Sequence, residues 1–128
     1  MAKNVLVVDD EPGIVKMVES RLRVAGYGVV TATGGEEALR KCRETKPDVA
    51  VLDVMMPGLP GDHVAQAMRD DPTLCDVPVI FLTALVRKQG APLDEAYLRG
   101  PVAGFYYLAK PFKGIELLEM LGKVLGDR

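Results

Sequence analysis

The sequence has few of the side chains that bind zinc or form disulfides. It contains one histidine and two cysteines, Cys42 and Cys75, whose separation matches no metal-binding motif. The chain therefore cannot complete a zinc site from its own cysteines and histidine. We expect Cys42 and Cys75 to be two reduced thiols of a cytosolic protein rather than a disulfide.

Long hydrophobic runs and an excess of positive charge are also missing. No apolar stretch approaches the roughly 20 residues of a membrane-spanning helix, and the N-terminus lacks the architecture of a signal peptide. The formal net charge is -2 with a pI near 5.4, whereas nucleic-acid and anionic-membrane surfaces need clustered Lys and Arg. We expect a cytoplasmic protein that binds neither nucleic acid nor membrane directly.

Linkers, internal repeats and low-complexity tracts are absent, so residues 1–128 are expected to form one domain. Hydrophobic residues make up 48% of the chain and charged residues 27%, the balance of a globular protein. A chain of this length buries a sufficient core without disulfides or metals.

Short apolar runs predict buried strands. Four of them lack polar alternation, as strands covered on both faces do: Val5–Val8, Val49–Leu52, Val77–Leu82 and Val102–Leu108. A weaker strand is expected over Gly28–Thr33.

Between these runs, apolar residues recur every three or four positions, which predicts amphipathic helices. The first helix has Pro12 near its start and Gly26 just past its end, and the next two span Glu36–Thr45 and Asp62–Asp70. The apolar stripes expected for the first and last helices comprise Ile14, Val18, Leu22 and Ala25, and Ile115, Leu118, Leu121 and Leu125.

The alternation of strands and helices predicts an α/β fold. Right-handed βαβ crossovers give a doubly wound parallel sheet of about five strands with helices on both faces. One further short helix is expected over Asp94–Leu98, inside a glycine- and proline-rich segment, 85–104.

Polar residues follow four of the predicted strands. Asp9 and Asp10 follow the first and Asp53 ends the run at 49–52, while Thr83 and Lys110 come at or just after the last two. In an open parallel sheet, ligands bind at the carboxyl ends of the strands. Three carboxylates, a hydroxyl and an ammonium are therefore expected to meet at one edge.

The chemistry of such a cluster points to a hard cation and a phosphoryl group. Clustered carboxylates repel each other and either share protons or bind a cation, and oxygen ligands alone suit Mg²⁺. A carboxylate such as Asp53 is a nucleophile toward phosphorus. Phosphoryl transfer then requires mainly positioning and positive charge, which a metal and Lys110 supply.

Simpler interpretations exist for single residues. Asp9 and Asp10 are also typical helix caps, Thr83 is an ordinary strand end, and Tyr107 is compatible with a core position. His63, the only histidine, is expected on a polar helix surface and not as a phosphodonor.

Together these motifs resemble the receiver domain of bacterial two-component response regulators, in particular the chemotaxis-regulator type of single domain. The resemblance covers essentially the whole chain and implies the flavodoxin-like strand order 2-1-3-4-5. The matching stretches are Val7-Val8-Asp9-Asp10-Glu11-Pro12, Leu52-Asp53-Val54-Met55-Met56-Pro57-Gly58, Phe81-Leu82-Thr83-Ala84 and Lys110-Pro111-Phe112.

The resemblance implies a role for each site residue. Asp53 would accept a phosphoryl group from a sensor histidine kinase or a phosphotransfer protein. Asp10 and Asp53 would bind Mg²⁺ directly with the backbone carbonyl of Met55, and Asp9 would help through water. Lys110 would pair with the acceptor carboxylate and then with a phosphoryl oxygen.

The resemblance also implies a switch. Thr83 would hydrogen-bond the phosphate while Tyr107 turns inward, and the Lys110–Pro111 bond matches a cis peptide of the family. The surface of the fourth helix, fifth strand and fifth helix would then change its affinity for an unidentified output protein. The protein would be a monomer or a phosphorylation-dependent dimer.

Several functional organisations stay open. The chain is either a stand-alone switch or the receiver portion of a larger transcription regulator or hybrid histidine kinase. A phosphatase with an aspartyl nucleophile is disfavoured because Met55, and not a second acid, lies two residues after Asp53. A scaffold without phosphorylation and a flavin carrier are also disfavoured, because the site residues are complete and no phosphate-binding loop follows the first strand. We expect a signalling protein that catalyses its own phosphorylation and slow dephosphorylation, and not an enzyme acting on external substrates.

Overall fold

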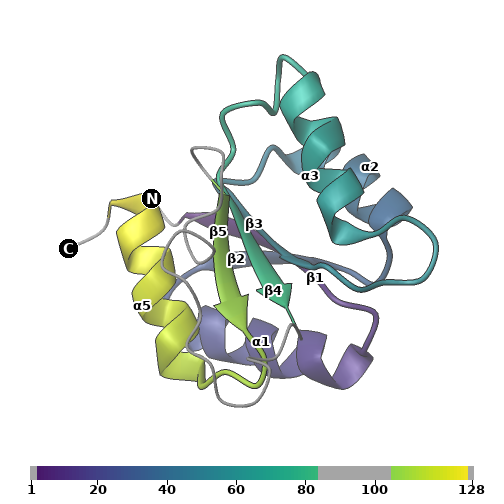
Figure 1. Cartoon of the computed structure of the whole chain (residues 1–128). Helices are drawn as coiled ribbons and strands as arrows, with labels where there is room; N and C mark the ends of the chain where they lie inside the picture. The colour runs from purple at the N-terminus through teal and green to yellow at the C-terminus, as the bar shows by residue number, and fades with distance from the viewer. Residues whose placement is uncertain (1–2, 84–104, 127–128) are drawn as a thin grey trace.

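The computed structural model describes residues 3–83 and 105–126, which form a parallel sheet between two layers of helices (Figure 1). The strands lie in the order β2-β1-β3-β4-β5, so the predicted doubly wound order is confirmed. Their bounds are Asn4–Val8 (β1), Gly28–Ala32 (β2), Val49–Asp53 (β3), Val79–Thr83 (β4) and Phe105–Ala109 (β5).

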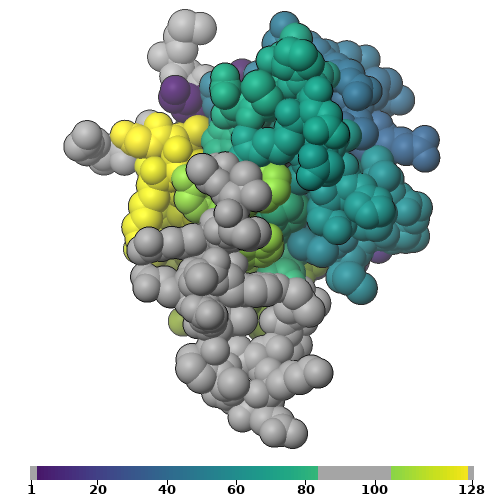
Figure 2. Space-filling model, turned by 45° about the horizontal axis from the view of Figure 1, so that its top comes forward, coloured from purple at the N-terminus to yellow at the C-terminus, as the bar shows by residue number. Residues whose placement is uncertain are grey.

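The helices cover the two faces in pairs. They span Pro12–Val24 (α1), Gly35–Thr45 (α2), Gly61–Asp70 (α3) and Gly114–Leu125 (α5). Helices α1 and α5 pack on one face and α2 and α3 on the other, which divides the core into two clusters. The space-filling view shows α5 (yellow) and α2 with α3 (blue and teal) on opposite flanks (Figure 2).

The three inner strands are hydrophobic on both faces, as the lack of alternation predicts. The prediction is wrong for the fourth run, because β5 lies at the end of the described sheet and its residues are only half-buried. Every residue of β3 and β4 is buried, and successive residues of β1 enter opposite clusters. The register pairs Val8 with Leu52, Asp53 with Leu82, and Thr83 with Ala109, so these strands end at one edge of the sheet.

The predicted stripe of α1 is partly wrong. Val18 and Leu22 are buried as expected, but Val15 is buried with them and Ile14 is only half-buried. Ala25 is exposed because it is the C-cap, beyond the last helical turn. Each helical step turns the side chain by about 100°, so an error of one position moves a residue off the buried face.

The stripe of α5 differs from the prediction at its first position. Leu121 is buried and Leu118 and Leu125 pack beside it as expected, but Leu117 is also buried, while Ile115 is 55% exposed. At the start of the helix, the backbone N–H of Lys113 donates to Oε1 of Glu116 at 2.6 Å. In this first turn Leu117, rather than Ile115, faces the sheet.

The two cysteines are free thiols, as predicted. Burial raises the pKa of the Cys42 thiol to about 11, and its sulfur lies 3.8 Å from that of Met68. Cys42 is therefore an unreactive part of the core between α2 and α3.

Some predictions lie outside the described residues. These are the short helix over Asp94–Leu98, the segment 85–104 around it, and the first residues of the strand expected over Val102–Leu108. Among the described helices, none has the length and apolarity needed to cross a bilayer.

The corrected orientation of α5 is testable by a pair of alanine substitutions. Leu117→Ala is expected to lower the free energy of unfolding by about 2–4 kcal/mol, because it leaves a cavity beneath the helix. Ile115→Ala should cost roughly 0.5 kcal/mol or less, because that side chain is largely in water. Urea denaturation followed by circular dichroism measures both values. Equal losses of unfolding free energy would show that Ile115 is buried as much as Leu117.

Candidate functional site

Three carboxylates meet where β1 and β3 end. Asp9 and Asp10 follow β1 and Asp53 is the last residue of β3, and their carboxylate oxygens lie within 4.8 Å of one another. Asp9 and Asp53 are buried, with 0% and 3% of their surfaces exposed, whereas Asp10 faces solvent. The predicted cluster therefore exists, and its open side is at Asp10.

Lys110 enters this cluster from the end of β5. Its Nζ lies 2.8 Å from Oδ2 of Asp9 and 3.4 Å from Oδ2 of Asp53. The backbone N–H of Lys110 donates to the carbonyl of Thr83 at 2.8 Å, and the Lys110–Pro111 bond is cis, as the resemblance implies. The lysine thus contacts the Asp53 carboxylate as predicted, but its shorter contact is with Asp9.

The electrostatics of the site are dominated by Asp53. Burial, and then the negative charge of Asp9, raise the pKa of Asp53 from 3.8 to about 6, against the opposing charge of Lys110. Burial alone would lower the pKa of Lys110, but the hydrogen bond and charge of Asp9, with the charge of Asp53, raise it above its ordinary value. One ammonium does not neutralise the carboxylates, so the site favours a cation.

The donor set fits a magnesium ion. It consists of carboxylate oxygens from Asp9, Asp10 and Asp53, with no thiol or imidazole among the described residues that make up the cluster. Mg²⁺ prefers such ligands and retains several waters, which the exposure of Asp10 permits. The contribution of the Met55 carbonyl stays a prediction.

Backbone N–H groups hold two of the carboxylates in place. Oδ1 of Asp9 accepts from the N–H of Glu11 at 3.0 Å, and Oδ1 of Asp53 accepts from the N–H of Met55 at 3.3 Å. Helix α1 has Glu11 as its N-cap without a side-chain cap hydrogen bond, so neither Asp9 nor Asp10 is the N-cap residue of α1. Asp9 fixes the turn that leads into the helix instead.

Thr83 lies on β4, which pairs with β3, and Tyr107 lies on β5, on the other side of β4. Thr83 ends β4 and is buried, and the small side chain of Ala109 lies opposite it. Tyr107 pairs with Phe81 in the register, and their rings stack with centroids 5.1 Å apart and planes at 26°. Because Phe81 and Thr83 are two residues apart on one strand, Tyr107 shares their face of the sheet. Their movement as a switch stays a prediction.

The loop after Asp53 presents an apolar surface beside this carboxylate. Met55 is 69% exposed, whereas Met56 is buried in the core between α2 and α3. An open hollow of about 340 Å³ is lined by Val54, Met55, Met56, Pro57 and Pro60. His63, on α3, is exposed, as predicted for a surface residue.

Gly61 belongs to the site but is not among the residues that the motifs predict. A Cβ at Gly61 would lie 2.2 Å from the backbone oxygen of Asp53 and 2.9 Å from its carbonyl carbon. The N–H of Gly61 also donates to the carbonyl of Val54 at 3.1 Å. The start of α3 can therefore lie this close to the backbone of Asp53 only with glycine at this position. The sequence signal is a glycine at the helix start, directly after Pro60.

Comparisons with known proteins agree with this geometry. A family model described as the response regulator receiver domain matches residues 5–122. The protein of Guillardia theta named "Probable transcriptional regulator ycf27" is 45% identical over 124 residues, which are 96% of this chain and 45% of that protein. The alkaline phosphatase synthesis transcriptional regulatory protein PhoP of Bacillus subtilis is 46% identical, over 91% of this chain and 46% of its own length. The chain thus spans about half the length of the curated relatives it matches.

Solved structures share the whole fold. Chemotaxis protein CheY4 of Vibrio cholerae has 35% identity and a TM-score of 0.81, over 98% of this chain and 100% of that one. The receiver domain of sensor histidine kinase PA1611 of Pseudomonas aeruginosa, with a magnesium ion coordinated in its active site cleft, has 30% identity and a TM-score of 0.81, over 98% and 99%. The complex of histidine kinase ThkA with response regulator protein TrrA contains a chain with 36% identity and a TM-score of 0.76. The match covers 96% of this chain and 98% of that one.

The raised pKa of Asp53 predicts a pH-dependent stability in the metal-free protein. The folded-state pKa of about 6 exceeds the ordinary value of 3.8, so the folded protein binds the proton more tightly than the unfolded chain. Stability should therefore fall as the pH rises from about 4 to 6 and then level off. Asp53→Asn should remove this fall, and above pH 6 it should be more stable than wild type by about 1–3 kcal/mol.

Urea titrations in chelator from pH 4 to 8 measure this effect. Asp76→Asn, which changes an exposed carboxylate to the same amide, is the control and should keep the wild-type profile. A wild-type profile that does not differ from that of Asp53→Asn would show that Asp53 titrates normally.

The close approach of Gly61 predicts that Gly61→Ala damages both the fold and the metal site. The added methyl displaces the end of β3 and should cost roughly 1–3 kcal/mol of unfolding free energy. Because Asp53 moves with that backbone, Mg²⁺ affinity should also fall when measured by calorimetry. Gly13→Ala is the control, since its methyl meets nothing within 4 Å in α1, and it should be neutral or slightly stabilising. Unchanged Mg²⁺ affinity in a folded Gly61→Ala protein would contradict the positioning role.

Proposed function

The chain belongs to the response regulator receiver domain family, and from this premise we propose that Asp53 is its phosphoacceptor. The observation that carries the proposal is the contact of Lys110 with both Asp9 and Asp53 at the open carboxylate cluster. These residues come from the ends of three strands, and a merely structural ion pair would not need the uncompensated negative charge beside it. The domain proposed to carry this chemistry is the whole chain, 1–128.

In the proposed reaction, a carboxylate oxygen of Asp53 attacks the phosphorus of a phosphohistidine. The new O–P bond forms as the P–N bond breaks, and the imidazole nitrogen leaves with the electron pair and takes up a proton. Bound Mg²⁺, held by Asp10, Asp53 and the Met55 carbonyl, with help from Asp9, would lower the cost of bringing a phosphoryl group to these carboxylates. The pKa near 6 leaves Asp53 mostly ionised at neutral pH, as a nucleophile must be.

Lys110 supplies fixed positive charge during this transfer. Its short contact with Asp9 holds the ammonium in the site even when Asp53 loses its free carboxylate oxygen. The ammonium can then interact with a phosphoryl oxygen, and the hydroxyl of Thr83 is proposed to donate to another. The added charge of about -1.5 to -2 would thereby change the conformation of β4 and β5, where Tyr107 is the proposed second residue of the switch.

The proposed phosphodonor is a sensor histidine kinase or a phosphotransfer protein. This assignment is supported by TrrA, which is similar to this chain and forms a complex with histidine kinase ThkA. The proposed output is a phosphorylation-dependent change in protein binding, by a monomer or a phosphorylation-dependent dimer in the cytoplasm. Autocatalytic phosphorylation and slow dephosphorylation, without turnover of external substrates, complete the proposal.

A second organisation is favoured by a separate observation. The curated relatives are named as transcriptional regulators, and this chain matches only about half of their length. The same acceptor chemistry would then control an output domain of a transcription regulator. The similarity to the receiver domain of a sensor histidine kinase supports a hybrid kinase in the same way.

Phosphorylation of Asp53 is tested by intact mass after incubation with a small phosphodonor and Mg²⁺. The wild type is expected to gain one phosphoryl group, and Asp53→Asn to gain none. Asp62→Asn, an exposed carboxylate on α3, should gain the group as wild type does. Chelation of the metal should abolish the gain. Modification that survives Asp53→Asn would overturn the proposal.

Lys110→Ala separates phosphorylation of Asp53 from the conformational response to it. This variant should still be modified, because the nucleophile is intact, but the amides of β4 and β5 should respond less to modification in NMR spectra. A full spectral response in Lys110→Ala would remove the lysine from the switch.

A further inference from the structure

Strand β2 forms one edge of the sheet and has the composition of a strand that pairs readily. The order β2-β1-β3-β4-β5 places it at the end of the described sheet. The segment Gly28–Thr33 contains two valines and two threonines but no charged residue and no proline. Exposed edges of this composition are templates for pairing with another strand.

Three positions of the strand cannot carry a protective charge, because their side chains pack into the core. Val29 packs into the cluster with α1 and α5, while Val30 and Ala32 pack into the cluster with α2 and α3. A lysine at any of these positions would be buried in apolar surroundings, at a cost of several kcal/mol. At these positions, protection of the edge therefore has to come from another element.

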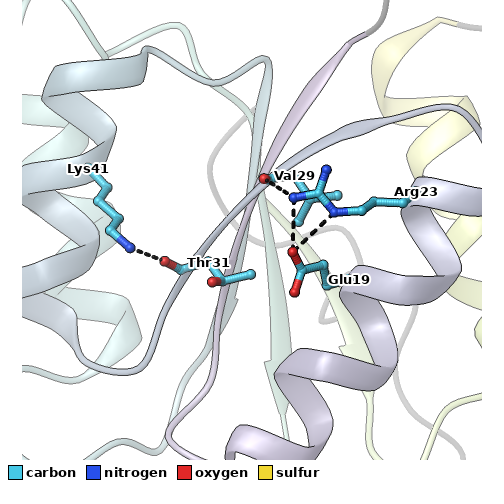
Figure 3. A network of polar contacts seen from close by, with 5 residues as sticks. All are labelled: Glu19, Arg23, Val29, Thr31 and Lys41. Carbon is cyan, nitrogen blue, oxygen red and sulfur yellow. Dashed lines mark hydrogen bonds and ion pairs between the residues drawn. The ribbon is translucent and has the colours of Figure 1, made fainter.

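Two outward-facing carbonyls of β2 are bound by side chains of the two flanking helices. The N–H of Gly28 and the carbonyl of Ala32 face β1, so Val29 and Thr31 direct theirs away from the sheet. Arg23 of α1 donates to the carbonyl of Val29 at 3.1 Å. Lys41 of α2 donates to the carbonyl of Thr31 at 2.5 Å. Figure 3 shows the two cations reaching the strand from opposite sides.

Each cation is held by a glutamate one turn earlier on its own helix. Arg23 lies 2.9 Å from Glu19, and Lys41 lies 3.2 Å from Glu37. A glutamate four residues before the cation is the favourable orientation for such a pair. Oε1 of Glu37 also accepts from the backbone N–H of Thr33 at 2.9 Å, so an outward donor of the same edge is bound as well.

We propose that Arg23 and Lys41 form a two-sided guard that closes the β2 edge to strand addition, and that the excluded strand is β2 of a second copy of this chain. A second β2 is the occupant that this edge fits. When two copies of β2 pair antiparallel about a twofold axis, the outward N–H and carbonyl of one Thr31 meet those of the other. The side chains of the partner strand are also free of charge.

The guard opposes this pairing through its hydrogen bonds. The incoming N–H groups need the carbonyls of Val29 and Thr31, and one of those N–H groups, that of Thr33, is itself bound to Glu37. Three charge-assisted hydrogen bonds must therefore break in each copy. Single exposed ion pairs contribute little to stability, but here they only need to outcompete an association between copies.

The test compares a variant without the guard with a control variant of the same net charge. Arg23→Ala with Lys41→Ala is compared with Lys16→Ala with Arg40→Ala, which takes one exposed cation from each of the same two helices. Both variants are examined unphosphorylated and metal-free by sedimentation velocity. The guard variant is expected to dimerise with a dissociation constant at least about tenfold below that of the control and the wild type. Because both variants lose two positive charges, a difference between them is not an effect of net charge.

A third substitution identifies the contact. Thr31→Pro in the guard variant removes an outward N–H without breaking a bond to β1, so it should restore the monomer. Hydrogen exchange should show the Thr31 amide protected only in the associated guard variant. Lys41→Ala alone, which keeps Arg23, should associate more weakly than the double variant. Equal association of guard variant and control, or association that survives Thr31→Pro, would overturn the proposal.

Discussion

The contact of one ammonium with two carboxylates joins the ends of three strands into a site. Lys110 follows β5, Asp9 follows β1 and Asp53 ends β3, and the lysine lies 2.8 and 3.4 Å from the two acids. Without that charge, two buried carboxylates would face each other in a largely apolar setting, which is unfavourable. The raised pKa of Asp53 shows that the compensation is incomplete. The same imbalance leaves net negative charge at the site, which favours the binding of a cation.

Much of this arrangement could be predicted from sequence patterns, because the parallel topology brings the ends of the apolar runs to one edge of the sheet. A strand buried on both faces needs an uninterrupted apolar run, and parallel strands end at one edge, so the residues after each run must meet. Asp9, Asp53 and Lys110 were predictable for this reason. The helix faces were less so: both Leu117 and Ile115 suit an apolar stripe, and the first turn of α5 decides between them.

Features that depend on short distances were not predictable. The motifs give Asp53 as the partner of Lys110, yet the shorter contact is with Asp9, and a difference of 0.6 Å leaves no trace in the residue pattern. Gly61 is similar, because its role comes from the backbone approach of α3 to Asp53 and not from a side chain. The guard of β2 likewise needs the register of the strand before Arg23 and Lys41 can be related to its carbonyls.

The division of the core into two clusters has an evolutionary consequence. Alternate residues of the strands enter separate hydrophobic compartments, one under α1 and α5 and one under α2 and α3. The stacked pair of Phe81 and Tyr107 belongs to the second compartment. A lineage can therefore accumulate compensating changes beneath α1 and α5 without repacking those rings, so the two halves of the interior are free to diverge at different rates.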